Sequence, residues 1–213
     1  MLRIVQPELL DSLPDDHPDA QHCRRDLRLT NFAMGNFRWF RRTLPPRLRP
    51  GDRVLELGAG GGELAQALRP WISHYTGLDR CPPSARWPAT WAWLRGDLRA
   101  FAHYDEHPVV LGNLIFHHLT TGELRALGSE FSQHARLVLA SEPARRRRYQ
   151  TLFDAGATLL GGSHVTRHDA RVSIAAGFLD DELPAALGLD AREWDWRCTT
   201  TALGAYRMIA VRR

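Results

Sequence analysis

Four glycines that follow an apolar run form the part of this sequence best suited to bind a ligand. Residues 53–57 read Arg-Val-Leu-Glu-Leu, a buried-strand pattern, and glycine occupies positions 58, 60, 61 and 62. Glycine lacks a Cβ atom, so the backbone of this turn can curl beneath a ligand. Apolar residues return at helical spacing over residues 63–68, which predicts a strand, a glycine turn and a helix. Such turns also occur without a ligand, but this combination indicates a nucleotide cofactor site.

Carboxylates follow the next two predicted strands. Asp79 ends an apolar run that begins at Tyr75, and Asp97 lies in a third candidate strand region, residues 91–98. An acid at the end of the second strand can accept hydrogen bonds from both hydroxyls of a ribose. A solvated surface position is the alternative for either acid alone, whereas their order after the glycine turn favours the cofactor site.

Four histidines are candidates for proton transfer. His117 and His118 follow a fourth apolar strand, and His164 and His168 lie in a later polar segment. Histidine titrates near neutral pH, so each could remove a proton from an acceptor, with His118 as the first choice. A structural role is an equal alternative for each of them. The spacing of His164, His168 and Asp169 also suggests metal ligands, but a third ligand and the glutamate of H-E-x-x-H are missing, so no metal is expected.

The elements that would position these residues alternate as the strands and helices of one α/β domain. Further strands are predicted over residues 108–116, 136–141, 193–200 and 205–212, and helices over residues 145–160 and 178–187. The fourth strand is almost wholly apolar, as expected at the centre of a sheet that is covered on both faces. With 213 residues, of which 44% are apolar, the chain can bury one substantial α/β core and has little left for a second domain.

The glycine turn distinguishes between two kinds of cofactor. A dinucleotide fingerprint fits poorly, because the sixth position from Gly58 is Glu63 rather than glycine. The run Glu56-Leu57-Gly58-Ala59-Gly60-Gly61-Gly62 instead resembles the E/D-x-G-x-G-x-G first motif of class I S-adenosylmethionine (SAM) dependent methyltransferases. The ending N-x-x-x-H-H-L at residues 113–119 is similar to one that many small-molecule methyltransferases carry after strand four. The resemblance implies a Rossmann-like α/β fold, with a seven-stranded mixed sheet, helices on both faces and an N-terminal helical lid.

The same resemblance implies how SAM and its product S-adenosylhomocysteine (SAH) would be held. Glu56 and the glycines would cradle the methionine end, and Asp79 would accept from the ribose. Asp97 would accept from the adenine amino group, and the Leu98 backbone N–H would meet the ring. The implied cofactor contacts are Glu56, Gly58, Ala59, Gly60, Asp79, Arg80, Asp97, Leu98 and Asn113.

Segments outside the cofactor core are expected to select the acceptor. Residues 1–50 are predicted to form the helical lid, with Gly35-Asn36 dividing its helical stretch, and residues 51–213 the core with a helical insertion at about 144–178. In the lid, Phe37, Trp39 and Phe40 are candidates for an apolar pocket wall, with plain packing as the alternative. The insertion carries V-T-R-H-D and resembles a bacterial group of small class I methyltransferases (type 11/12-like), which implies an aromatic acceptor.

Composition excludes several other chemistries. The chain has no lysine, so all 28 basic residues are arginine and no Schiff base, pyridoxal phosphate attachment or P-loop lysine can exist. The net charge is +4, but the arginines are mostly dispersed, which favours solvated faces over an RNA-binding patch. Three widely spaced cysteines indicate neither a disulfide framework nor a zinc knuckle. Without an apolar run of membrane length or a secretory segment, we expect a cytoplasmic protein, as a monomer or homodimer.

Together these features predict methyl transfer from SAM to the oxygen or carbon of a small phenolic or quinone-like acceptor, by in-line displacement. The alternatives are an RNA or protein methyltransferase, a non-catalytic SAM-fold binding subunit and a nicotinamide oxidoreductase. The first is disfavoured because strand four lacks the N-P-P-Y type of ending. The intact motif residues disfavour a non-catalytic binding subunit. The spacing of the glycines disfavours a nicotinamide oxidoreductase.

Overall fold

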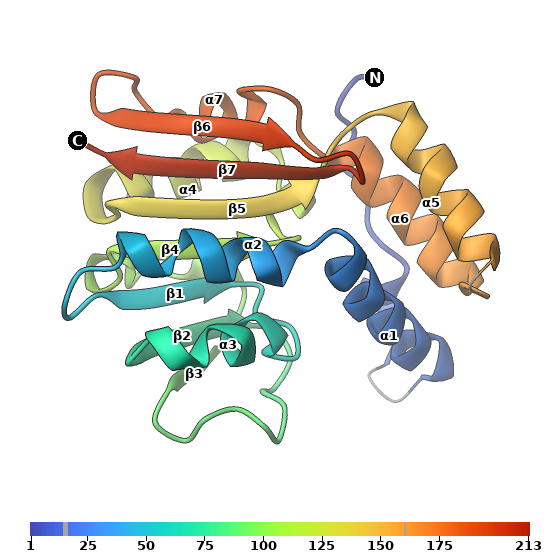
Figure 1. Ribbon diagram of the computed structural model, residues 1–213, viewed down its shortest axis with the longest axis horizontal. Helices are drawn as coiled ribbons and strands as arrows, with labels where there is room; N and C mark the ends of the chain where they lie inside the picture. Colours follow the sequence, from blue (N-terminus) through green and yellow to red (C-terminus); the bar gives the residue numbers. More distant parts are fainter. Residues whose placement is uncertain (15–16, 160) are drawn as a thin grey trace.

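The computed structural model describes residues 1–14, 17–159 and 161–213, and its centre is one seven-stranded sheet (Figure 1). The strand order is β3-β2-β1-β4-β5-β7-β6. The first five of these are parallel, and β7 runs antiparallel to both β5 and β6. The strands are β1 (Arg53–Leu57), β2 (His74–Asp79), β3 (Ala92–Arg95), β4 (Val109–Asn113), β5 (Leu137–Pro143), β6 (Trp194–Thr200) and β7 (Ala205–Arg212). The predicted seven-stranded mixed sheet is therefore confirmed.

Seven α-helices occur in the described residues, and four of them cover the sheet. In Figure 1, α2 and α3 lie over one face, and α4 and α7 over the other. The helices are α1 (Pro18–Ala33), α2 (Asn36–Thr43), α3 (Glu63–Leu68), α4 (Thr121–His134), α5 (Arg147–Leu159), α6 (His164–Ala176) and α7 (Glu182–Leu187). None of the helices in the described ranges combines the length and apolar character needed to cross a bilayer.

Alternation along the strands builds a separate apolar core on each face. Val54 packs with Phe40 and Leu64 beneath α2 and α3, whereas its neighbour Leu55 belongs to the cluster that contains Phe131 and Leu187, beneath α4 and α7. Successive side chains of a strand point to opposite faces, so one apolar strand supplies both cores. This two-sided burial fixes the sheet and the position of its carboxyl edge.

Three helices gather beside the carboxyl ends of the parallel strands: α1, α5 and α6 (Figure 1). The predicted division of the N-terminal helical stretch is seen at Gly35, whose φ of 65° is left-handed and separates α1 from α2. The segment that carries V-T-R-H-D forms the start of α6, where the Ser163 hydroxyl accepts the Thr166 N–H at 3.1 Å. In open α/β sheets the carboxyl edge is where ligands bind.

Four predicted elements are shorter than expected by two or more residues. The fourth strand, predicted over residues 108–116, ends at Asn113 because Leu114 has a left-handed φ of 58°. Strand β3 ends at Arg95, because Asp97 accepts the Arg99 N–H at 2.9 Å and starts a 3-10 turn. The helix predicted from residue 178 begins only at Glu182, because the Phe178 N–H bonds to the Pro143 carbonyl and Asp180 has a φ of 42°. The helix predicted over residues 145–160 runs from Arg147 to Leu159, and Leu160 lies outside the described residues.

Candidate functional site

The glycine turn after β1 is left-handed at three positions. Gly58, Gly60 and Gly62 have φ angles of 65°, 53° and 78°, values that side chains strongly disfavour. A Cβ atom on Gly58 would lie 2.6 Å from Cδ1 of Ile115, whereas a Cβ on Gly60 would meet nothing within 4 Å. Packing therefore requires glycine at position 58, and position 60 leaves open space where a ligand can approach.

Asp79 ties this turn to the end of β2. One carboxylate oxygen accepts the Gly60 N–H at 2.7 Å, and the other accepts the Cys81 N–H at 2.9 Å. Each carboxylate oxygen has two acceptor positions, so both oxygens keep one for a further donor. Asp79 also lines a cavity at the carboxyl edge of the sheet, so its position fits the predicted contact with a ribose.

A cavity of about 760 Å³ opens at the carboxyl edge of the sheet. One side is formed by the glycine turn and Asp79, and another by His117 and His118 after β4. Residues of α1, α5 and α6 complete the walls, which are mainly apolar. Pockets with a few polar groups among apolar walls are typical of small-molecule and cofactor sites.

Glu56 is the acid of the first motif, and it is almost completely buried beside the cavity. Its carboxyl accepts the hydroxyl hydrogen of Tyr75 at 2.7 Å. Burial, which disfavours the charged form, raises the pKa of Glu56 to about 8, and the charges of Glu63 and Asp79 add to the rise. The group that the resemblance places at the methionine end of SAM is therefore protonated at neutral pH in the ligand-free protein.

Asn113 connects the end of β4 to α1. Its Nδ2 donates to Oδ1 of Asn31 on α1 at 3.0 Å, and Asn36 at the start of α2 donates to the same oxygen. The Oδ1 atom of Asn113 is buried without a hydrogen-bond partner in the part of the chain that the structure describes. Buried polar atoms are normally paired, so this oxygen beside the cavity suits a donor from a ligand.

His117 is buried between two carboxylates. Its Nδ1 lies 2.6 Å from Oε2 of Glu142, at the end of β5, and its Nε2 lies 3.5 Å from Oε1 of Glu8. Burial alone would lower the pKa of His117, but hydrogen bonds to Glu142 and Glu8 outweigh it and raise the pKa to about 9. His117 is therefore a positively charged group at neutral pH rather than a free base.

His118 has the opposite character. Burial and the charge of His117 lower the pKa of His118 to about 4, so its ring is neutral at neutral pH. Its side chain is 24% exposed and lines the cavity. Nε2 lies 3.9 Å from Oε1 of Glu8, and Nδ1 lies 4.0 Å from Oδ2 of Asp11. Among the four predicted histidines, His118 combines a free lone pair with access to the cavity.

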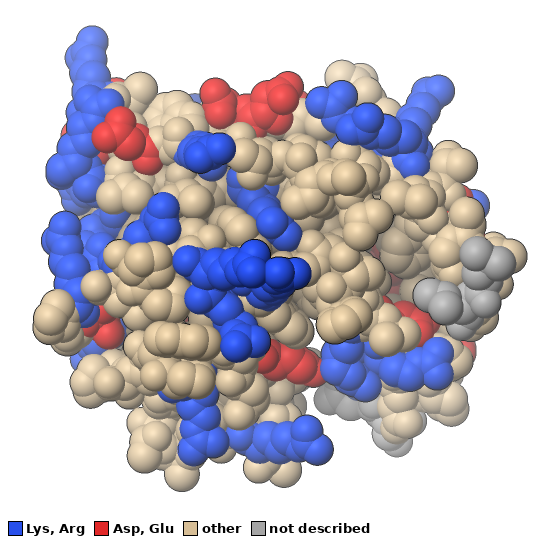
Figure 2. Space-filling view, viewed as in Figure 1, with Lys and Arg blue, Asp and Glu red and all other residues tan. Residues whose placement is uncertain are grey.

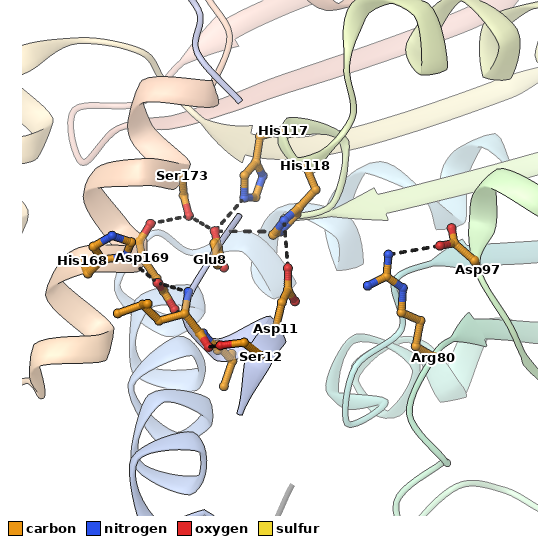
Figure 3. Close-up of polar contacts among 12 residues, drawn as sticks. Glu8, Asp11, Ser12, Arg80, Asp97, His117, His118, His168, Asp169 and Ser173 are labelled. Carbon is orange, nitrogen blue, oxygen red and sulfur yellow. Dashed lines mark hydrogen bonds and ion pairs between the residues drawn. The ribbon is translucent and has the colours of Figure 1, made fainter. Parts of the chain in front are cut away.

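The N-terminal segment supplies two site residues that the sequence did not indicate, Glu8 and Asp11 (Figure 3). The carboxylate of Asp169 on α6 holds this segment by accepting the N–H groups of Leu9 and Leu10, at 2.7 and 3.0 Å. Arg3 holds the beginning of the N-terminal segment, because its guanidinium donates to the Leu119 carbonyl at 2.7 Å. No periodicity or motif marks this segment, because its role depends on contacts with α6 and the chain after β4.

Two supporting residues were also missed. Glu142 is fully buried and accepts the N–H groups of Ile115, Phe116 and His117 besides the His117 ring. Ser173 on α6 donates its hydroxyl hydrogen to Oε1 of Glu8. A charged residue at the end of an apolar strand was a signal that could have identified Glu142.

The predicted adenine site is arranged differently. Asp97 accepts hydrogen bonds from Arg80 at 3.1 Å and from Arg99 at 3.0 Å, and its side chain is partly exposed. Figure 3 places the Arg80–Asp97 pair apart from the histidine cluster. Asp97, Leu98 and Arg80 are not among the residues that line the cavity, whereas Ala59 and Gly60 are. The adenine contacts implied by the resemblance stay a prediction.

Of the other predicted site residues, one lines the cavity and the rest do not. Phe37 lines the cavity, but Phe40 is fully buried in the core beneath α2, and Trp39 packs against Phe40 and the Arg207 guanidinium. The pocket-wall prediction is therefore wrong for Trp39 and Phe40, because only the first turn of α2 reaches the cavity. His164 and His168 do not line it either, and Nδ1 of His168 lies 3.0 Å from Asp169.

Comparisons with known proteins agree with this fold. No protein-family model and no curated protein matches the sequence. Among solved structures, the plantazolicin methyltransferase BpumL in complex with SAH is similar at a TM-score of 0.70 with 12% identity, over 96% of this chain and 92% of that one. The pyocyanin biosynthetic protein PhzM gives a TM-score of 0.66 with 18% identity, over 97% of this chain and 62% of PhzM.

The methyltransferase domain of bacterial CtHen1 is also similar, with a TM-score of 0.54 and 13% identity over 87% of this chain and all of that domain. The chain therefore has the Rossmann-like fold of SAM-dependent methyltransferases, as the first motif predicted.

Proposed function

We propose that this protein is a SAM-dependent methyltransferase that acts on a small acceptor. The observation that carries the proposal is one cavity whose walls include the glycine turn with Asp79 on one side and His118 on another. Methyl transfer requires a cofactor and an acceptor to meet in one enclosed space from which water is excluded. The fold shared with methyltransferases, one of which was solved with SAH, supports the same reaction.

Four residues of the chain fit the cofactor. The open backbone at Gly60 admits the ligand, Asp79 has acceptor positions for ribose hydroxyls, Glu56 lies at the turn, and the unpaired Asn113 oxygen can accept from a ligand. When bound, SAM supplies a methyl group on a positively charged sulfur, so the protein need not generate an electrophile.

The acceptor would occupy the apolar part of the cavity beside His118. Phe37, Met34, Leu152 and Phe153 line this cavity and suit a planar apolar molecule, which agrees with a phenolic or quinone-like acceptor. The ring of His118 is neutral and reaches the cavity, so it can accept the hydrogen bond of an acceptor hydroxyl. Its lowered pKa makes it a weak base, which can receive the proton as the oxygen–methyl bond forms and the hydroxyl becomes strongly acidic. Both O- and C-methylation are compatible with this arrangement.

A small acceptor is favoured over RNA or a protein. The walls of the cavity are mainly apolar. On the face of the molecule drawn in Figure 2, the arginines lie in several separate groups among acidic and uncharged side chains. Backbone phosphates call for a continuous basic surface instead. Two similar structures are a plantazolicin methyltransferase and a pyocyanin biosynthetic protein by name. We expect a cytoplasmic monomer or homodimer, consistent with three cysteines that form no disulfide.

The first experiment is calorimetric titration of the purified protein with SAM, SAH and NADH in parallel. We expect SAM and SAH to bind with dissociation constants on the order of micromolar and NADH not to bind. Tight NADH binding would replace the proposal by an oxidoreductase. An absence of SAM and SAH binding would contradict the cofactor assignment.

Turnover separates an enzyme from a SAM-binding subunit. In a screen of phenols and quinols, we expect methylated product from the wild-type protein and a decrease in kcat of roughly 10²-fold or more for His118→Ala, with unchanged SAH affinity. His134→Ala, on the far helix α4, is the matched histidine control. Equal turnover in His118→Ala would show that another group, or none, removes the proton.

A further inference from the structure

Glu8, His117 and His118 bring three metal-ligating atoms together at the cavity wall. One ligand atom from each residue lies within 4.8 Å of the other two. The residues come from two separate segments, since Glu8 belongs to the N-terminal segment and the histidines to the 3-10 turn after β4. Figure 3 shows the Glu8 carboxylate turned toward both imidazole rings.

The separations suit a tetrahedral ion. Oε1 of Glu8 lies 3.5 Å from Nε2 of His117 and 3.9 Å from Nε2 of His118. Ligands at about 2.0–2.1 Å from a tetrahedral zinc ion are about 3.3–3.4 Å apart, so small side-chain rotations would complete the geometry. Two imidazoles and one carboxylate are a ligand set that favours zinc and neighbouring divalent transition metals over magnesium or calcium.

Two of the three side chains, His117 and Glu8, are held by a hydrogen bond to a further partner, as metal ligands commonly are. His117 has its Nδ1 on Glu142 at 2.6 Å, which directs Nε2 toward Glu8. Glu8 accepts the Ser173 hydroxyl, and His118 has Asp11 4.0 Å from its Nδ1. A carboxylate on the far nitrogen of a ligating histidine fixes the ring and makes it a better ligand.

We propose that Glu8, His117 and His118 bind one divalent transition metal ion, with zinc as the best fit, at the wall of the acceptor cavity. Only three protein ligands converge there within the described residues, so a fourth position faces the cavity. Three protein ligands and one open position are typical of catalytic rather than structural zinc sites. The metal-free form of this cluster is an ion-pair network, with a charged His117 between Glu8 and Glu142.

The role of the ion rests on the proposed methyltransferase function, whereas its binding does not. A hydroxyl of the acceptor at the open position would be oriented and made more acidic by the metal. In that state His118 is a ligand, and the proton-accepting role described above belongs to the metal-free protein. The acceptor class is narrowed to molecules with an oxygen donor at or next to the methylated atom.

The test is metal binding by the full chain without SAM or acceptor. Chelator-treated protein is titrated with Zn²⁺ by calorimetry and with Co²⁺ by visible absorption, which reports tetrahedral coordination. We expect one ion per chain, d–d bands of a tetrahedral N/O site, and at least a roughly 100-fold weaker affinity in Glu8→Gln and His118→Asn. Ser173→Ala should weaken binding by roughly 10-fold, as supporting partners of metal ligands do.

Two controls separate this site from adventitious binding. His134→Asn alters an exposed pair in which Nε2 lies 3.8 Å from Glu130, and it should bind zinc as the wild type does. Cys23→Ser removes a thiol that also lines the cavity, and it should leave the cobalt spectrum unchanged. Circular dichroism verifies that each variant is folded.

No zinc binding at millimolar concentration, or binding that is equal in wild type, Glu8→Gln and His118→Asn, would overturn the metal site. Neither result affects the methyltransferase proposal, which is tested by SAM binding in metal-free protein. Absence of SAM binding, in turn, would leave a measured zinc site standing and remove only its role in methylation.

Discussion

The imidazole of His117 lies 2.6 Å from the carboxylate of Glu142, and both side chains are buried at the end of the central strands. The same carboxylate accepts three backbone N–H groups from residues 115–117. These contacts hold the turn after β4, in which Leu114 has a left-handed φ of 58°. Glu142 therefore positions both histidines, although it does not line the cavity itself.

Replacing Glu142 by glutamine should destabilise the fold. The change leaves a charged His117 with only Glu8 as its counter-ion and weakens three charge-assisted hydrogen bonds. Breaking a buried pair in this way costs about 3 kcal/mol or more. Urea unfolding of the two proteins measures the difference. Glu130→Gln, in an exposed pair with His134, should cost less than about 1 kcal/mol. Equal losses in both variants would contradict this role for Glu142.

Asp79 and Asp97 are expected to differ in their effect on SAH binding. Asp79→Ala removes a carboxylate that lines the cavity and holds the Gly60 N–H, so we expect roughly 100-fold weaker binding. Asp97→Ala removes a group engaged by Arg80 and Arg99 outside the cavity lining, so we expect a change of less than about 10-fold. Calorimetry measures both. An equal loss in Asp97→Ala would support the adenine contact that the sequence resemblance implies.

Glu56 should make stability depend on pH. Burial raises its pKa to about 8 in the folded protein, above the value of about 4.5 in an exposed chain, so the folded state retains a proton that the unfolded state loses. The contribution is fully present below pH 4.5 and is lost as pH rises through about 8. Each pKa unit corresponds to about 1.4 kcal/mol, so the difference between pH 5 and pH 9 is a few kcal/mol.

Glu56→Gln should remove this part of the pH dependence, because glutamine keeps an acceptor for Tyr75 without a titrating group. Urea unfolding at pH 5 and pH 9 compares the variant with the wild type. Glu106→Gln, whose partner Arg53 is exposed, is the matched control and should keep the wild-type slope. A slope that survives in Glu56→Gln would mean that Glu56 is already ionised in the folded protein.

Asp169→Ala should release the N-terminal segment from α6. The Leu9 and Leu10 N–H groups lose their carboxylate acceptor, so their hydrogen exchange should accelerate by roughly 10-fold or more. Exchange measured by NMR or mass spectrometry on the N-terminal peptide detects this change. His168→Ala removes only the ring beside Asp169 and should leave both amides protected. Unchanged exchange in Asp169→Ala would show that Arg3 and Glu8 suffice to hold the segment.

Local sequence determined the side of the cavity formed by the glycine turn and Asp79. The apolar run before Gly58 and the helical spacing after it require a strand, a tight turn and a helix. Asp79 ends the next strand, so it lies at the same edge of the sheet as the turn whenever β1 and β2 pair in parallel. Parallel pairing of neighbouring strands brings their carboxyl ends to one edge, so residues close to strand ends meet without further information. The break between α1 and α2 at Gly35 was equally local, because a left-handed residue interrupts a helix.

Only the tertiary structure decided the side of the cavity formed by His117, His118 and Glu8. The sequence favoured His118 over His117 but gave them no different charge, and burial between Glu142 and Glu8 is what charges the His117 ring while the His118 ring stays neutral. It also could not distinguish Phe37, at the cavity, from Phe40, in the core, since both lie in one short helix. Glu8 reaches the histidines from more than one hundred residues away in the chain, through contacts with Ser173 and Asp169 that no local pattern records. Proton affinity and metal affinity depend on such distances and on burial, and these exist only once the chain has folded.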